Sequence, residues 1–189
     1  MSASVQGYVA NELARGGYQN VHDLLAQACA KHPQRAAFSC GDDQLTYAEL
    51  GSLADAFARY LRHHAGLQPG DRLALQLPNS LQYPIAVFGA LKAGLVIVNT
   101  NPQYTAAEAR HQFRDSGARA ILVLDRLLPL VRAVQADTEL EHVMLTSVDD
   151  LQRPIHEGSE AGTQRFMQAL RLGAESPPLE REAGLDRLA

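Results

Sequence analysis

Cysteine is scarce in this sequence, whose 189 residues include only Cys29 and Cys40. The two cysteines form no CxxC pair, and no histidine is spaced to complete a zinc site with them. The sequence therefore predicts no zinc site. Such sparing use of cysteine fits a protein of the reducing cytoplasm.

Positive charge is not in excess either, because 17 lysines and arginines stand against 21 aspartates and glutamates, for a net charge of -4. A nucleic-acid-binding domain usually carries a basic footprint, so this balance predicts no nucleic-acid partner. Residues 1–17 contain no basic region followed by an apolar stretch, and we expect no secretory signal. The most apolar window, residues 85–98, is too short to span a bilayer.

Phosphate-binding and nucleophile motifs are also missing. The sequence contains no GxxxxGK[ST], GxGxxG or GxSxG pattern. The acidic neighbours Asp42 and Asp43 are better explained by a hairpin turn than by the acid pair of a phosphoacceptor domain. His63 and His64 are adjacent, which places them about 100° apart on a helix, a poor geometry for a shared metal. The sequence thus predicts no catalytic residue and no metal ligand.

What the sequence does contain begins with a helix and a hairpin. Asn20 can cap a helix whose apolar positions between 21 and 28 share one face, and Pro33 should end it. The segments 36–40 and 44–46 then flank turn-forming residues and predict a β-hairpin.

Two later helices have a clear start signal. Thr46 with Glu49, and Thr105 with Glu108, have the spacing of a capping box, in which hydroxyl and carboxylate satisfy reciprocal backbone donors. Gly117 follows the second of these helices and should end it.

Between residues 72 and 146, short apolar runs alternate with helical patterns. The predicted strands are 72–77, 95–98, 119–124 and 142–146. Apolar runs without alternation indicate strands covered on both faces, and Asn79 or Ser80 should cap the helix after the first of them. We predict an α/β fold with a mainly parallel, doubly wound sheet, helices on both faces, and the N-terminal helix and β-hairpin in addition. No further strand is expected beyond Asp150.

Ligands of open parallel sheets bind beyond the carboxyl ends of the strands. The turn at 99–105 lies at such an end, and the capped helix that follows it could favour an anion. The segments 78–80, 125–126 and 146–150 should reach the same edge. A short turn of asparagine and proline can also serve only to connect a strand to a helix, and the sequence leaves both explanations open.

Two stretches, LTYAEL at 45–50 and LKAGLVIVNTNPQYT at 91–105, resemble the first two motifs of the adenylate-forming superfamily. Joined by PGDRLALQLPNSLQYPIAVFGA and followed by EARHQFRDSGARAILV, they look like bacterial long-chain fatty-acid CoA ligases in particular. The resemblance covers roughly residues 20–150. It implies a reaction in which ATP, with Mg²⁺, and a fatty acid form an acyl-adenylate and pyrophosphate, after which coenzyme A takes the acyl group.

The resemblance also implies a place for coenzyme A. Some relatives hold its nucleotide end near the second motif, and the arginine expected at the ribose phosphate falls between two arginines of this sequence. The candidates on the coenzyme A side are Asn101, Pro102, Gln103, Arg126 and Arg132. The phosphate loop, acyl tunnel and catalytic lysine of the family have no counterpart here, so no cofactor is expected to bind this chain tightly.

These observations predict three regions. Residues 1–19 are expected to be an N-terminal extension, 20–150 the N-terminal α/β subdomain of an AMP-forming acyl-CoA ligase, and 151–189 a linker toward an absent phosphate loop. The leading hypothesis is an N-terminal fragment of an ATP-dependent long-chain fatty-acid CoA ligase, inactive alone. The alternative is a complete, small, non-catalytic binding or interaction module of the same fold. We expect a cytoplasmic protein that could dock peripherally on the inner membrane face; the sequence predicts no oligomeric state.

Overall fold

The structure is a computed structural model, and it describes residues 21–151 and 160–180. In chain order the helices and strands are α2 (Val21–Lys31), β1 (Ala36–Cys40), β2 (Asp43–Thr46), α3 (Tyr47–His63), β3 (Arg72–Gln76), α4 (Gln82–Lys92), β4 (Val96–Asn99), α5 (Ala106–Ser116), β5 (Ala120–Leu124), the 3-10 turn η1 (Asp125–Leu127), α6 (Leu128–Gln135), β6 (His142–Thr146), β7 (Thr163–Arg165) and α7 (Phe166–Glu175). No helix in these two ranges is long and apolar enough to cross a membrane.

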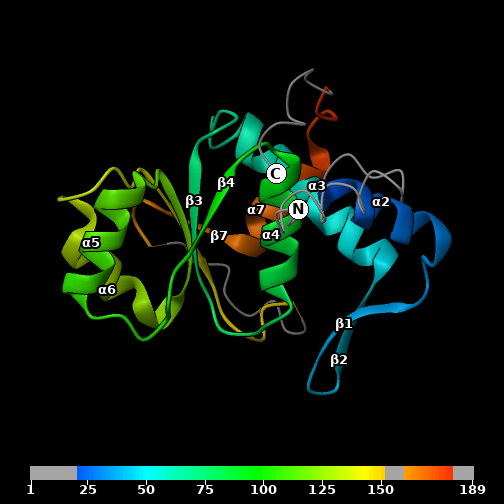
Figure 1. The fold of residues 1–189 in the computed structure, drawn as a ribbon, viewed down its shortest axis with the longest axis horizontal. Coiled ribbons are helices and arrows are strands. Elements are labelled where there is room, and N and C mark those ends of the chain that lie inside the picture. Colours follow the sequence, from blue (N-terminus) through cyan, green and yellow to red (C-terminus); the bar gives the residue numbers. More distant parts are fainter. Residues whose placement is uncertain (1–20, 152–159, 181–189) are drawn as a thin grey trace, which may run out of the picture.

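A five-stranded sheet forms the centre of the fold, with strand order β4-β3-β5-β6-β7 and every neighbouring pair parallel. Helices α5 and α6 cover one face, and α3, α4 and α7 lie on the other (Figure 1). Alternate residues of the strands face the two sides: Leu73 and Leu75 belong to one buried cluster and Ala74 to the other. The predicted doubly wound sheet with helices on both faces is confirmed.

The strands differ in how well they are covered. All five residues of β5 are buried, as predicted for a strand with helices on both faces. β4 was predicted to be equally covered, and this is wrong, because Val96 and Asn99 are exposed. β4 is an edge strand within the described sheet, and an apolar run in the sequence does not reveal strand order.

The predicted N-terminal elements are present. α2 ends before Pro33, and β1 and β2 pair antiparallel around the turn at Gly41 and Asp42. The apolar face of α2 is only partly buried, since Leu25 packs against the core while Val21 and Leu24 are exposed.

The helix starts follow local chemistry where that chemistry is specific. Both capping boxes form, at Thr46 with Glu49 and at Thr105 with Glu108. The prediction that Asn79 or Ser80 caps α4 is wrong. The N-cap residue is Leu81, in a helical conformation, and no side chain caps this helix.

The chain beyond Asp150 adds a strand and a helix, contrary to the expectation of no further strand. β7 pairs with β6, and α7 packs along α3, with the ring of Phe166 edge-on to that of Phe57 at a centroid distance of 5.0 Å. Gly173 allows this approach, because a Cβ atom there would lie 1.8 Å from the carbonyl oxygen of Ala56. Helices α3 and α7 therefore touch backbone to backbone.

We expect Gly173→Ala to lower the free energy of unfolding by about 2 kcal/mol, because the added methyl group forces the two helices apart. Urea denaturation monitored by circular dichroism measures the loss. Gly51→Ala in α3 is the matched control, since its Cβ would meet only the end of a side chain, Cys29 Sγ, at 3.0 Å. An equal loss of unfolding free energy in both variants would contradict the close packing of α3 and α7 as its cause.

Candidate functional site

The carboxyl edge of the sheet gathers most of the polar side chains singled out in the sequence. Because the strands are parallel, the loops after β3, β4, β5 and β6 all leave from this edge. The turn after β4 and the segment of η1 leave from β4 and β5, two strands that flank β3 and so lie two strand spacings apart, about 10 Å.

The turn after β4 is closed by its own side chain. Asn101 Oδ1 accepts a hydrogen bond from the backbone N–H of Gln103 at 2.9 Å, and the Tyr104 N–H donates to the carbonyl of Asn101 at 3.1 Å. This arrangement is an Asx turn. Asn101 and Gln103 are exposed, and Pro102 between them is half-buried. The side-chain amide nitrogen of Asn101 remains available as a donor.

The helix after this turn begins with a charged cap. Glu108 accepts hydrogen bonds from the backbone N–H and the hydroxyl of Thr105, and these bonds lower the pKa of its carboxyl group. The carboxylate thus occupies the helix N-terminus that the sequence offered as an anion site. An external anion at α5 would have to compete with Glu108.

Arg126 and Arg132 have different surroundings. Arg132 donates to the carbonyl of Ala161 and, at 2.9 Å, to Gln135 Oε1, so it fastens the segment before β7 to α6. The exposed side chain of Arg126 makes no hydrogen bond or ion pair with the rest of the described chain. Of the two arginines, Arg126 is the one whose guanidinium can meet a ligand without losing a structural contact.

A buried ionic cluster lies further along the same edge, and its centre, Arg165, was not predicted from the sequence. Arg165, at the end of β7, pairs with Asp125 at 2.5 Å and with Asp150 at 3.0 Å. Asp150 also accepts from the Ser147 N–H at 2.8 Å and the Thr146 hydroxyl at 3.1 Å. The cluster joins the loops after β5 and β6 to the last strand.

Unsatisfied polar atoms mark the same region. Within the described ranges, four buried side-chain oxygens have no hydrogen-bond partner: Gln76 Oε1, Ser80 Oγ, Gln82 Oε1 and Gln112 Oε1. Gln76 ends β3, and Ser80 and Gln82 lie at the start of α4. Gln112 reaches the end of β4, since its Nε2 donates to the carbonyl of Asn99 at 2.9 Å. Buried groups of this kind require an explanation, and their concentration at one edge separates it from the rest of the described core.

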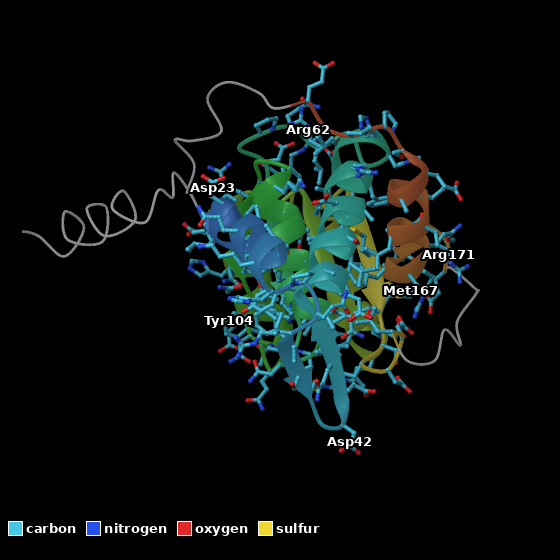
Figure 2. All side chains as sticks on the ribbon, turned by 90° about the vertical axis from the view of Figure 1, so that its right-hand side faces the viewer. Asp23, Asp42, Arg62, Tyr104, Met167 and Arg171 are labelled. Carbon is cyan, nitrogen blue, oxygen red and sulfur yellow. The ribbon has the colours of Figure 1, made fainter. Side chains whose placement is uncertain are left out.

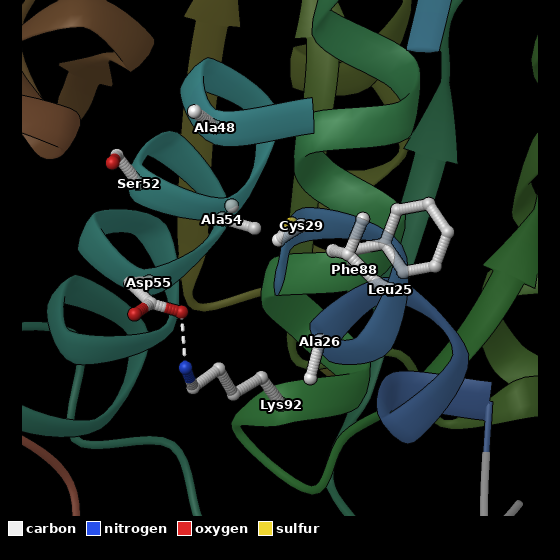
Figure 3. A pocket seen from close by; sticks show the side chains of 10 residues that line it. Leu25, Ala26, Cys29, Ala48, Ser52, Ala54, Asp55, Phe88 and Lys92 are labelled. Atoms are coloured by element: carbon white, nitrogen blue, oxygen red, sulfur yellow. Dashed lines mark hydrogen bonds and ion pairs between the residues drawn. The ribbon is translucent and has the colours of Figure 1, made fainter. Parts of the chain in front are cut away.

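A pocket of about 300 Å³ lies elsewhere, between α2, α3 and α4 (Figure 3). Leu25 and Phe88 form part of its apolar wall, and Lys92 pairs with Asp55 at one end. Burial raises the pKa of the Cys29 thiol, which donates to the carbonyl of Tyr47 at 3.0 Å. Lys92 and Asp55 neutralise each other, so this pocket offers less than the carboxyl edge to orient a polar ligand.

The candidate site thus combines predicted and unpredicted parts. The structure brings the turn at Asn101, Pro102 and Gln103 to the same edge as Arg126, whereas Arg132 is held by structural contacts. The described residues contain no group of three or more His, Cys, Asp or Glu side chains that could hold a metal ion.

Comparison with known proteins shows the family of the chain and the fold that it shares. The family model described as "AMP-binding enzyme" matches residues 25–183. The chain is 40% identical over 142 residues to a long-chain-fatty-acid–CoA ligase of Escherichia coli O6:H1, covering 75% of this chain and 25% of the ligase. A ligase of the same name from Haemophilus influenzae is 44% identical over 133 residues, covering 70% and 24%. The solved apo structure of MbtA from Mycobacterium smegmatis is similar with a TM-score of 0.70 and 30% identity, over 92% of this chain and 31% of that one. The chain spans about a quarter of the length of the curated relatives it matches.

Proposed function

This chain belongs to the family of AMP-binding enzymes, and from that premise we propose that it is the N-terminal part of an ATP-dependent long-chain fatty-acid CoA ligase. The two curated relatives that share 40% and 44% of their aligned residues with it both carry that name. In the proposed reaction, the fatty acid carboxylate attacks ATP to give an acyl-adenylate and pyrophosphate. The thiol of coenzyme A then displaces AMP to give the acyl-CoA.

This chain serves the second half-reaction, in which coenzyme A takes the acyl group. The observation that carries this proposal is the Asx turn after β4, which presents the exposed Asn101 and Gln103 at the same sheet edge as Arg126, an arginine with no partner among the described residues. An amide donor and a guanidinium at one edge suit the oxygens of a ribose phosphate and a diphosphate, which are the polar groups at the nucleotide end of coenzyme A.

The groups that stabilise the adenylation step are proposed to come from elsewhere in the longer protein. ATP needs hydrogen-bond donors for its phosphates, Mg²⁺ needs ligands, and the fatty acid needs an acyl tunnel. The described residues offer neither a glycine-rich loop nor a cluster of metal ligands. We further propose a cytoplasmic location with peripheral contact to the inner membrane face, because the fatty acid substrate partitions into membranes.

In the full-length ligase, Asn101→Ala should raise the KM for coenzyme A about five- to tenfold, the effect of losing one neutral hydrogen bond. Arg126→Ala should raise it about tenfold to a hundredfold, because a hydrogen bond to a charged group contributes more. Adenylate formation should change by less than twofold. The first half-reaction is measured as fatty-acid-dependent exchange of pyrophosphate into ATP, and the second as acyl-CoA formation at varied coenzyme A.

Arg171→Ala is the matched control for Arg126→Ala. Arg171 is an exposed arginine on α7, and it lies on the opposite side of the molecule from Tyr104, a residue of the turn (Figure 2). Equal losses in both half-reactions, or none in either, would show that Asn101 and Arg126 serve only the fold. Binding of coenzyme A by a full-length protein that forms no acyl-adenylate would instead favour a non-catalytic binding module.

A further inference from the structure

Two glutamine side chains bind the backbone of residues 99–101, where β4 ends and the turn begins. Gln76, the last residue of β3, donates from Nε2 to the carbonyl of Asn101 at 3.1 Å, and Gln112 of α5 donates to the carbonyl of Asn99 at 2.9 Å. From α4, the hydroxyl of Tyr83 donates to Asn99 Oδ1 at 2.7 Å. Groups from three separate elements therefore fix one short turn.

The need to satisfy backbone carbonyls is not a full explanation of these contacts, because it leaves buried acceptors on the glutamines themselves. Asn99 and Asn101, whose carbonyls are bound, are exposed residues. Gln76 is fully buried, and the side-chain oxygens Gln76 Oε1 and Gln112 Oε1 have no partner among the described residues. A buried acceptor without a donor costs free energy, and two apolar side chains would avoid that cost. The arrangement therefore favours a precise position of the turn over maximal stability.

We propose that Gln76 and Gln112 are positioning residues for coenzyme A recognition, acting through the turn that they hold. Asn101 Oδ1 is already bonded to the Gln103 N–H, which leaves the Asn101 amide nitrogen as the donor for a ligand oxygen. The two glutamines fix the backbone on which this donor stands before the ligand arrives. A preorganised turn loses less conformational freedom on binding than a mobile one. The inference rests on the proposed function.

Gln112→Met in the full-length ligase is the test, because methionine has a similar length and volume but neither donates nor accepts a strong hydrogen bond. Gln112 is chosen over the fully buried Gln76, whose replacement could prevent folding. The KM for coenzyme A should rise about fivefold, as for the loss of one hydrogen bond. Pyrophosphate exchange and kcat should stay within twofold. Amide hydrogen exchange should become faster in the peptide covering residues 99–105.

Two further variants complete the experiment. The carboxylate of Gln112→Glu cannot donate to the carbonyl of Asn99, so the KM of this variant for coenzyme A should rise at least as much as that of Gln112→Met. Gln168→Met, on the exposed face of α7, should change neither the KM nor the exchange of the turn.

The inference is overturned by an unchanged coenzyme A KM in Gln112→Met, or by an equal fall in both half-reactions together with a lower melting temperature. These outcomes differ from a failure of the proposed function. A wild-type protein that forms no acyl-CoA at all would contradict the proposed function and the inference together, whereas a wild type that uses coenzyme A normally tests the inference alone.

Discussion

The 189-residue chain, purified by itself, will show no fatty-acid-dependent exchange of labelled pyrophosphate into ATP. Adenylation develops negative charge on the phosphates, and enzymes stabilise that charge with preorganised backbone donors, a cation and usually a lysine. Removing a single such donor costs about 3 to 4 kcal/mol, a factor of several hundred in rate. The described residues lack both a glycine-rich phosphate loop and a cluster of metal ligands, so the loss should be complete.

The measurement compares the chain with the full-length protein under identical conditions. Circular dichroism must first show that the isolated chain is folded, because an unfolded chain would be inactive for a trivial reason. Exchange by the chain above a blank without protein, retained through further purification, would mean that the adenylation site lies within these residues.

Replacing Arg165 by alanine should lower the free energy of unfolding by about 3 to 5 kcal/mol, the usual cost of removing one partner from a buried ion pair. Only 7% of the Arg165 side chain and 3% of that of Asp150 are exposed to solvent. Without the guanidinium, the Asp150 carboxylate stays buried with no cation beside it. Asp125 would lose the same partner, and β7 its link to the loop after β5.

Arg132→Ala is the matched control for this variant. Arg132 also spans two segments, but its side chain is exposed, so its removal should cost no more than about 1 kcal/mol. Urea denaturation of both variants gives the comparison. A loss below about 1 kcal/mol for Arg165→Ala would indicate that solvent reaches the cluster in the folded protein.

Prediction from sequence succeeded where the signal was local. The capping boxes at Thr46 and Thr105 depend on residues three positions apart, and both helices begin where the sequence indicates. Prediction failed where a structure depends on residues far away in the chain. The sequence TQR of β7 has no strand pattern, and Arg165 is held there by Asp125, 40 residues earlier in the chain. The exposure of β4 likewise depends on its place at the edge of the described sheet.

The candidate site shows the same division. The turn at Asn101 was predicted because asparagine and proline at a strand end are a local signal. Gln76 and Gln112 were not, because a glutamine within an apolar strand or a polar helix has many explanations. The one available clue was Gln76 itself, a single amide side chain in the apolar segment RLALQL. Its partner, the carbonyl of Asn101, is 25 residues away, and only the sheet brings the two together.

The close contact between α3 and α7 also has a consequence for protein synthesis. The rings of Phe57 and Phe166 pack edge-on, yet the two residues lie 109 positions apart in the chain (166 − 57). At about 5 to 20 residues per second, a ribosome needs roughly 5 to 20 seconds to add the second ring after the first. During that interval the apolar side of α3 that later meets α7 emerges without its native cover. A chaperone or a temporary contact within the nascent chain would have to shield it until α7 arrives.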